Sequence, residues 1–367
     1  MKKDYLIREE ANGGVVSTQN LKSNTVGLDL GDRWSRYCVL GKNGDVIEED
    51  RVRTTAAGIE TRFARIPATR IVIEAGTHSP WVSRQLTGYG HEVVVANARK
   101  VRLIYESDRK NDRVDARMLA RLGRVDASLL APVRHRSAEA QADLAMIRSR
   151  DALVGARTQL INAARGLVKA MGGRLPKSTT GAFANKTASA IPQPLEAALA
   201  PLLKSVRALS EQIQRYDRQI EKLSEEKYPE TRVLRQVHGV GTLTALSYVL
   251  TLEDPSHFSK SRDVGCYLGL RPRQSESGES APQLGISKSG NGYLRRLLVQ
   301  CAQYILGPFG VDSNLRRWGL QLASRGGKNS KKRAVVAVAR KLAVLLHRLW
   351  SRGEVYQPLY GQVPQAA

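Results

Sequence analysis

The stretch Thr25-Val26-Gly27-Leu28-Asp29-Leu30-Gly31 decides the fold of the first part of the chain. It is an apolar, β-rich run that ends on a carboxylate, and Arg70-Ile71-Val72-Ile73-Glu74 repeats the pattern. A third acidic stretch, Lys110-Asn111-Asp112-Arg113-Val114-Asp115, opens an expected helix. Carboxylates at two strand ends and a helix start can converge at one edge of a sheet, where they repel one another without a cation. Such oxygen ligands suit Mg²⁺ or Mn²⁺, which keeps places for phosphate oxygens.

The elements expected around these stretches follow the order βββαβαβα. Strands are expected at 25–30, 36–40, 46–53, 70–74 and 91–96, and helices at 56–66, 80–89 and 112–125. Three meandering strands followed by alternating helices and strands describe the ribonuclease-H-like (RuvC-like) α/β fold. That fold assembles a metal site from its first strand, its fourth strand and the helix after the fifth. We therefore expect Asp29, Glu74, Asp112 and Asp115 to be catalytic and to bind the metal.

The chain is strongly basic. Lys and Arg outnumber Asp and Glu by 58 to 34, which gives a formal charge of +24. This excess predicts strong, salt-sensitive binding to a polyanion, of which nucleic acid is the natural choice. The alternative is a basic enzyme with a small substrate.

The cysteine spacing and the hydropathy of the chain indicate the cellular compartment in which it is expected. Cys38, Cys266 and Cys301 are an odd number without a CxxC pair, so neither a disulfide framework nor a thiolate zinc site is indicated. There is no signal-peptide pattern, and no uninterrupted apolar run approaches the ~20 residues of a membrane span. We expect a cytoplasmic, nucleoid-associated protein without membrane contact.

Four segments follow from these patterns. Residues 1–23 are expected to be a flexible leader, 24–132 the ribonuclease-H-like domain, 133–228 a helical linker and 229–367 a mostly helical C-terminal domain. The linker carries apolar residues at alternating spacings of four and three: Leu195, Leu199, Leu202, Val206, Leu209, Ile213, Tyr216, Ile220 and Leu223. This a/d seam predicts a coiled coil over about 201–226, within the chain or between chains, beginning at Pro201. The alternative is a helix packed in its own core.

The C-terminal part holds a turn and several cations. Gln236–Ala245 resembles the turn of a helix-hairpin-helix, in which Gly239 and Gly241 would let backbone N–H groups approach a phosphate. An ordinary tight turn is an equal alternative. The basic run 325–333 leads into an amphipathic helix, so we expect phosphate contacts there. The cations proposed to bind nucleic acid are Arg271, Arg273, Lys288, Arg295, Arg296, Lys328, Lys331, Lys332 and Arg333.

The ordered set of motifs resembles a family of bacterial insertion-sequence transposases with a DEDD catalytic set, also described as bridge-RNA-guided recombinases. The matching motifs are Val26–Gly31, Val72–Gly76, Lys110–Ala116, His238–Gly241, Tyr267–Pro272, Ser277-Gly278, Ile286–Asn291, Tyr293–Leu298 and Ala339–Ala343. They cover about residues 24–352 in the family's order. Asn111 stands where the family has Thr, which leaves the carboxylates in place.

The resemblance implies the chemistry and the partners. The DEDD domain would bind Mg²⁺ and act with a serine of the C-terminal domain, which falls on Ser277 rather than on Ser275 or Ser280. Attack by this hydroxyl would leave a phosphoserine link that conserves bond energy for rejoining. The implied partners are donor and target DNA, a guide RNA, and further copies of the chain in a dimer or tetramer. No His neighbours Ser277, so a His-based triad is not indicated.

Three other functions fit part of the pattern. An actin/hexokinase-like ATPase shares the Asp-Leu-Gly strand, but the second glycine-rich phosphate loop and the duplicated domain are missing. A structure-specific junction nuclease would use the same carboxylates with water as nucleophile. A DNA-binding protein with an inactive catalytic domain is disfavoured because all four carboxylates are present.

Overall fold

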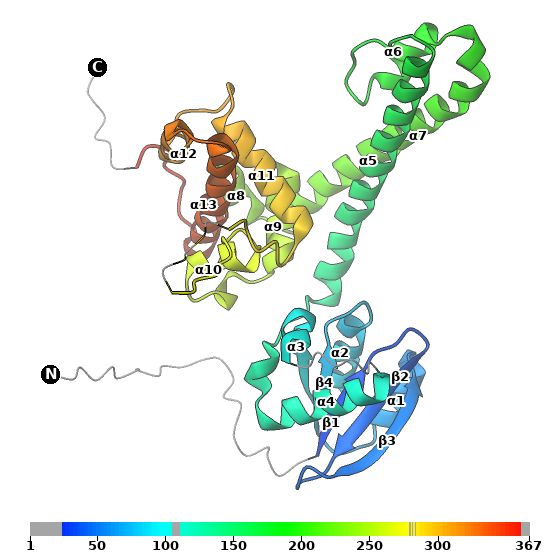
Figure 1. The fold of residues 1–367 in the computed structure, drawn as a ribbon, viewed down its shortest axis with the longest axis vertical. Coiled ribbons are helices and arrows are strands. Elements are labelled where there is room, and N and C mark those ends of the chain that lie inside the picture. Colours follow the sequence, from blue (N-terminus) through cyan, green and yellow to red (C-terminus); the bar gives the residue numbers. More distant parts are fainter. Residues whose placement is uncertain (1–23, 105–110, 279, 281, 283, 361–367) are drawn as a thin grey trace, which may run out of the picture. The chain divides into compact units, whose positions relative to one another are not determined.

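The computed structural model describes residues 24–104, 111–278, 280, 282 and 284–360. The chain divides into two compact units, Met1–Arg136 and Ser137–Ala367 (Figure 1). The predicted leader, residues 1–23, lies outside the described residues. The first unit is an α/β layer structure and the second consists almost entirely of helices.

Five strands of the first unit form one mixed sheet in the order β3-β2-β1-β4-β5. Their bounds are β1 Thr25–Asp29, β2 Trp34–Leu40, β3 Val46–Arg53, β4 Arg70–Glu74 and β5 Glu92–Ala96. The first three pair antiparallel, whereas β4 and β5 run parallel to β1. This mixed sheet is compatible with the predicted ribonuclease-H-like fold. The sequence did not predict helix α3 (Ala98–Ile104), which lies between β5 and α4.

Helices cover both faces of this sheet, and strand alternation decides which residue meets which helix. Leu28, Ile71 and Ile73 face α1 (Ala56–Phe63) and α2 (Ser79–Gly88) in one core. On the opposite face, Cys38 and Val72 lie in the two small cores that include α4 (Asp112–Val125). The bounds of β4 and α4 agree with those predicted from sequence.

Gly27 lets α4 lie directly on β1. A Cβ atom at this position would stand 2.0 Å from the carbonyl oxygen of Ala116 and 2.5 Å from the amide nitrogen of Ala120. Backbone atoms cannot rotate away as a side chain can, so any side chain here would push the helix off the sheet. The first motif therefore requires glycine at position 27 so that α4 can pack on β1.

We expect Gly27→Ala to lower the free energy of unfolding by about 1–3 kcal/mol because it overpacks this contact. Gly88→Ala is the matched control, since a Cβ atom there has no atom within 4 Å and replacing a helical glycine stabilises slightly. Urea unfolding followed by circular dichroism measures both. Equal midpoints for the two variants would contradict the packing role of Gly27.

The second unit begins with two long antiparallel helices, α5 (Ala138–Ala170) and α7 (Glu196–Glu226). The polar contacts that join them show the pairing: Lys227 with Asp143 near one end, Arg150 Nε with Asp217 Oδ1 at 2.5 Å, and Arg157 Nη1 with Ser210 Oγ at 3.3 Å. The predicted seam therefore packs within the chain. Its apolar members Leu199, Val206 and Ile220 are buried against residues of α5.

Two details of this hairpin differ from the sequence prediction. Helix α7 starts at Glu196, so Pro201 lies inside it near its start, where the missing N–H removes only one helical bond. Between the two long helices, the segment 172–194 of the predicted helical linker is only partly helical, with the short helix α6 (Phe183–Thr187) and 3₁₀ turns at Ala188–Ala190 and Gln193–Leu195. Phe183 is fully buried against α5 and α7, which explains why this loop is ordered.

Six helices complete the second unit around one apolar core. They are α8 Thr231–Arg235, α9 Thr242–Leu252, α10 Ser261–Tyr267, α11 Gly292–Leu306, α12 Asn314–Ser324 and α13 Ser330–Arg352. Tyr248 is fully buried in this core, and its hydroxyl donates to the carbonyl of Ala343 at 2.7 Å. Among the described helices none is long and apolar enough to cross a membrane.

Candidate functional site

Asp29 and Glu74 end neighbouring parallel strands. Leu28 of β1 is in register with Ile73 of β4, so the two carboxylates follow at the same level of the sheet. Side chains alternate along a strand, so Asp29 points to the same face as Gly27, and Glu74 to the same face as Val72. That face carries α4, and both carboxylates are partly exposed there.

The start of α4 lies toward the same edge. Near the helix end, the carbonyl of Gly123 accepts a hydrogen bond at 3.1 Å from Arg70, the first residue of β4, whereas Ala116 and Ala120 lie against Gly27, further along β1. The helix therefore runs opposite to β1 and β4. Its first turn, which holds Asp112 and Asp115, lies toward the strand ends that carry the carboxylates. Figure 1 shows α4 along β1 in this unit.

Asn111 begins this helix. Its side-chain oxygen accepts a hydrogen bond from the amide of Arg113 at 3.0 Å, as an N-cap residue does. Thr can make the same cap, which explains in physical terms why Asn is tolerated here. The acidic first turn is favoured further by the positive end of the helix dipole.

Glu49 of β3 fastens the same helix. Its carboxylate binds Arg117 through Nε at 2.7 Å and Nη2 at 2.9 Å, and Arg113 through Nε at 2.6 Å. These guanidinium groups, Arg117 foremost, lower the pKa of Glu49 to about 2. The carboxylate therefore stays ionised at neutral pH and holds the first turns of α4 beside the sheet.

The loops that follow the two strand carboxylates also meet. His78 Nε2 lies 3.7 Å from Asp32 Oδ1, which joins the loop after β1 to the loop after β4. Trp81 donates its indole N–H to His78 Nδ1 at 3.1 Å, so the imidazole proton is on Nε2 and faces Asp32. This contact ties together the two segments that carry Asp29 and Glu74.

Asp29 and Glu74 end adjacent strands on the face that carries α4, and Asp112 and Asp115 lie in the first turn of that helix, but the four do not form a closed cluster. Within the described ranges, no group of three or more His, Cys, Asp or Glu side chains is close enough to hold a metal ion. The segment that leads into Asp112, residues 105–110, lies outside those ranges. The donor set nevertheless suits a hard divalent cation, because it contains carboxylate oxygens only.

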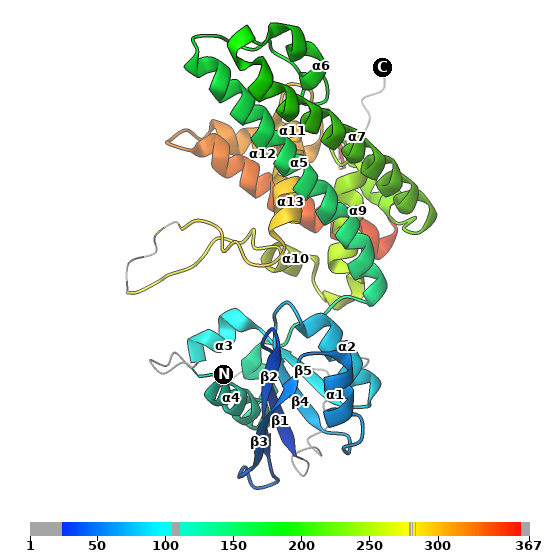
Figure 2. The same cartoon turned by 90° about the vertical axis from the view of Figure 1, so that its right-hand side faces the viewer.

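Ser277 lies at the tip of a β-hairpin arm in the second unit. The arm is opened by the bridge Pro272–Ile286 and by Arg273 N–H donating to Gly285 at 3.0 Å. At the tip, Ser277 and Ser280 exchange two backbone hydrogen bonds, of 3.1 and 3.0 Å. Figure 2 shows the arm projecting from the helices, in yellow.

The residue after Ser277 shapes this tip. Gly278 has a φ of +56°, and no atom lies within 4 Å of where its Cβ would be. A positive φ at the first position of a two-residue turn is typical of hairpin turns and favours glycine. The backbone beside the serine is thus open to a large ligand such as a phosphodiester.

The base of the arm is held by close packing. A Cβ atom on Gly290 would stand 2.0 Å from the carbonyl oxygen of Tyr267, and one on Gly269 would stand 2.3 Å from that of Ser289. Arg295 donates to the carbonyls of Leu268 at 2.9 Å and Ser289 at 2.6 Å. Arg295, predicted to contact nucleic acid, therefore also fastens the arm to α11.

Two histidines of the second unit have partners of their own. His238 Nε2 is 3.3 Å from the hydroxyl of Tyr304, and His257 lies 3.6 Å from Asp254, so each is engaged elsewhere. Ser277 belongs to the second compact unit and the four carboxylates to the first.

The predicted helix-hairpin-helix turn lies between α8 and α9, and its two glycines differ. Gly239 has a φ of +94°, and a Cβ there would come within 3.0 Å of Tyr304 and 3.3 Å of Ile305. It therefore serves the packing of α11. Gly241 starts α9 with open space around it and no side-chain cap, which leaves first-turn N–H groups accessible.

The predicted nucleic-acid cations fall into two groups. Three have partners within the chain: Arg295 donates to the carbonyls of Leu268 and Ser289, Arg296 is held by Asp151 at 2.6 Å and stacks on Tyr293, and Arg271 donates to Gln274. The others are exposed side chains on the arm and around the start of α13: Arg273, Lys288, Lys328, Lys331, Lys332 and Arg333.

A cluster of one aromatic and two cationic side chains, at the edge of the sheet where Asp29 lies, was not predicted from the sequence. The Trp34 ring lies under two guanidinium groups, with Arg51 at 4.5 Å and Arg53 at 4.8 Å from its centroid. Trp34 pairs with Arg53 across β2 and β3. A register shift between Val39 and Leu40 separates this pair from the turn at 41–45, so counting outward from the turn would place Trp34 opposite Val52 instead of Arg53.

The chain matches two family models. Residues 26–172 match the model described as a DEDD transposase. Residues 231–314 match the model described as the transposase IS116/IS110/IS902 family. Asp29, Glu74, Asp112 and Asp115 fall within the first match, and Ser277 falls within the second.

Curated relatives match nearly the whole chain. It is 30% identical over 341 residues to the transposase for insertion sequence element IS1111A of Coxiella burnetii, covering 90% of this chain and 91% of that protein. It is 29% identical to a probable family 20 transposase of Pseudomonas aeruginosa, covering 91% and 98%. It is 28% identical to the transposase for insertion sequence element IS1328 of Yersinia enterocolitica, covering 90% and 98%.

Proposed function

The chain belongs to the IS116/IS110/IS902 family of insertion-sequence transposases, and from that premise we propose that it cuts and rejoins DNA strands with Mg²⁺-bound carboxylates and a serine nucleophile. The observation that carries this proposal is the arrangement of β1, β4 and α4. Three separate stretches of sequence carry Asp29 and Glu74 at the ends of adjacent strands, and Asp112 and Asp115 in the first turn of the helix packed on that face.

These carboxylates would hold the metal. Asp29 and Glu74, on adjacent strands, supply two fixed ligands, while Asp112 and Asp115 approach from the helix start. Bound there, a divalent cation would neutralise charge that develops on the scissile phosphate. Phosphate oxygens of the substrate would complete the coordination of the cation.

Ser277 would supply the nucleophile. Its Oγ attacks phosphorus, a phosphodiester P–O bond breaks, and the leaving strand ends in a hydroxyl that takes up a proton while the serine proton passes to solvent. Attack by the hydroxyl of another strand then reverses the step and releases Ser277. No external energy source is needed, because each P–O bond broken is matched by one formed.

The charge of the chain supports nucleic-acid partners. With +24 overall and exposed cations on the arm and the start of α13, the protein offers contacts to several phosphates. We propose donor and target DNA as substrates, a guide RNA as a further partner, and a dimer or tetramer as the working unit. Sequencing the nucleic acid that co-purifies with the protein tests the RNA: a defined small RNA supports guidance, and random cellular RNA contradicts it.

The main alternative is a junction nuclease that uses the same carboxylates and water. The two mechanisms differ in products. We expect incubation with paired supercoiled plasmids carrying the element's ends, and Mg²⁺, to yield joined recombinant circles in an amount comparable to the cut strands. Nicked or linear DNA that is never rejoined would favour the nuclease. A no-metal reaction in chelator is the control for metal-independent cleavage.

A further inference from the structure

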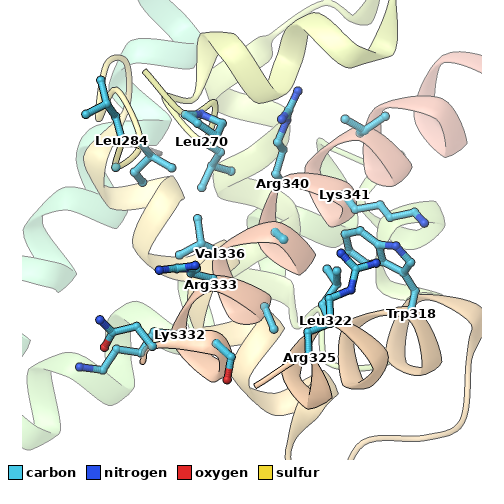
Figure 3. A pocket seen from close by; sticks show the side chains of 18 of the residues that line it. Leu270, Leu284, Trp318, Leu322, Arg325, Lys332, Arg333, Val336, Arg340 and Lys341 are labelled. Atoms are coloured by element: carbon cyan, nitrogen blue, oxygen red, sulfur yellow. The ribbon is translucent and has the colours of Figure 1, made fainter. Parts of the chain in front are cut away.

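A large cavity of the second unit lies at the base of the arm that carries Ser277. It has a volume of about 1140 Å³ and is bounded by residues of the arm on one side and by α12 and α13 on the other. Figure 3 shows Leu270 and Leu284 of the arm facing Trp318 and Leu322 of α12 across Val336 of α13. Small-molecule pockets usually hold roughly 300–1,000 Å³, so the cavity has room for more than one nucleotide.

The rim of this cavity is cationic. Seven of its lining residues carry a positive charge and none carries a negative one: Arg262, Lys288, Arg325, Lys332, Arg333, Arg340 and Lys341. Other cations of the same unit are neutralised internally, as in Arg150–Asp217, Arg296–Asp151 and Arg317–Asp312. In the part of the chain that the structure describes, no ion pair neutralises any of the seven. Such a set attracts an anion with several charges.

The floor is apolar and includes a flat ring. Leucine, isoleucine, valine and proline side chains surround Trp318, whose ring lies 4.3 Å from the ammonium nitrogen of Lys341. An inorganic anion would make no favourable contact with this apolar floor. A nucleotide combines a flat, weakly polar base with a charged phosphate, so it matches both the floor and the rim.

Base pairing decides which form of nucleic acid can enter. In a duplex the faces of the bases are stacked on one another, and only the phosphates and groove edges are available. An unpaired stretch can turn its bases onto an aromatic side chain while its backbone follows the cations. We propose that this cavity binds an unpaired stretch of nucleic acid, with a base against Trp318 and its phosphates on the cationic rim. The inference rests on the proposed action on nucleic acid.

Occupancy would position the nucleophile. Pro272 and Ile286, the bridged pair at the base of the arm, both line the cavity. A strand bound there would touch the base of the same hairpin whose tip carries Ser277. Binding would thereby fix the direction in which the arm presents its serine.

The first experiment changes charge on one turn of α13. Lys332 lines the cavity and Lys331 does not, and both are exposed in the first turn of the helix. Glutamate is favoured at a helix start, so Lys332→Glu and Lys331→Glu should both fold. By fluorescence anisotropy with the full chain, we expect Lys332→Glu to weaken binding of a labelled 12-nucleotide oligo-dT about tenfold more than binding of a matched duplex. Lys331→Glu should affect both probes alike.

The second experiment changes the ring. Trp318→Leu keeps an apolar side chain and removes the stacking surface, whereas Trp318→Phe keeps a ring. We expect the leucine variant to lose about tenfold in affinity for oligo-dT, with duplex binding unchanged, and the phenylalanine variant to lose less, as follows from the usual size of base stacking on aromatic residues. Circular dichroism confirms that each variant is folded.

Two results would overturn the inference. One is an equal loss of oligo-dT and duplex affinity in both Lys332→Glu and Trp318→Leu, or no loss in either. The other is binding of a labelled acidic amphipathic peptide that is weakened by Lys332→Glu and Trp318→Leu while oligo-dT binding is unchanged, which would make the cavity a peptide site. If these variants lose affinity equally for oligo-dT and for duplex while wild-type protein still joins plasmids, the inference about the cavity fails and the proposed function stands.

Discussion

Asp29→Asn and Glu74→Gln are each expected to reduce DNA strand cleavage in Mg²⁺ by about 10³-fold or more. Each substitution removes one anionic oxygen ligand from the edge where β1 and β4 end. A metal ion contributes several kcal/mol to stabilising charge in such reactions, and each 1.36 kcal/mol is tenfold in rate. DNA binding should persist, because the exposed cations are untouched.

Folding should also persist in these variants. Removing one of several neighbouring carboxylates relieves repulsion, so the free energy of unfolding should stay constant or rise. Asp45→Asn is the matched control: this exposed residue lies in the turn between β2 and β3, away from the edge, and should keep full activity. Full cleavage by Asp29→Asn under the same conditions would refute the metal site. Gel analysis of end-labelled DNA measures both variants.

Much of the first unit could be predicted from sequence because its signals are local. Strand runs that end in a carboxylate, and a capped helix that starts at Asp112, depend on neighbouring residues only. The closeness of α4 to β1 could not be predicted, because it depends on Gly27 meeting Ala116 across a long stretch of sequence. Helix α3 was missed because its residues, rich in Arg and Lys, lack clear periodicity.

The seam of α7 shows a different limit. The alternating spacing was predicted correctly. The spacing alone does not indicate which element packs against these apolar residues, and in the structure that element is α5. The buried stripe also includes Ser210 and Ser224, while Leu209 and Leu223 are only half-buried. Ser210 is within 3.3 Å of Arg157, and Ser224 within 2.8 Å of Thr231, so local hydrogen bonds make these polar positions compatible with burial. The oligomeric state stays a prediction.

The arm and the cavity could be predicted least. Ser277 is one of several loop serines, and only its resemblance to a family motif singled it out. The hairpin that exposes it depends on Gly269 and Gly290 at its base, where no periodic pattern exists. The cavity needs α12, which was not predicted from the sequence, and cations from α10, α13, the end of α12 and the arm.

Ser277→Ala is expected to abolish recombination, with a loss on the order of 10⁴–10⁶-fold, as removal of an enzyme nucleophile commonly gives. The variant should fold and bind DNA as wild type, because the side chain is exposed and its turn is held by backbone bonds to Ser280. Ser275→Ala, on the same exposed arm, is the matched control and should keep most activity. Recombinant plasmid counted by quantitative PCR gives the comparison.

The most direct measurement is mass spectrometry of the protein–DNA adduct. Wild-type protein is reacted with an end-bearing DNA in Mg²⁺, denatured during the reaction, and digested with protease and nuclease. The account predicts a nucleotide joined through phosphate to the peptide that contains Ser277, absent from Ser277→Ala and from Asp29→Asn. Cut DNA with no adduct, or cleavage that persists in Ser277→Ala but not in Asp29→Asn, would contradict the serine and make water the nucleophile.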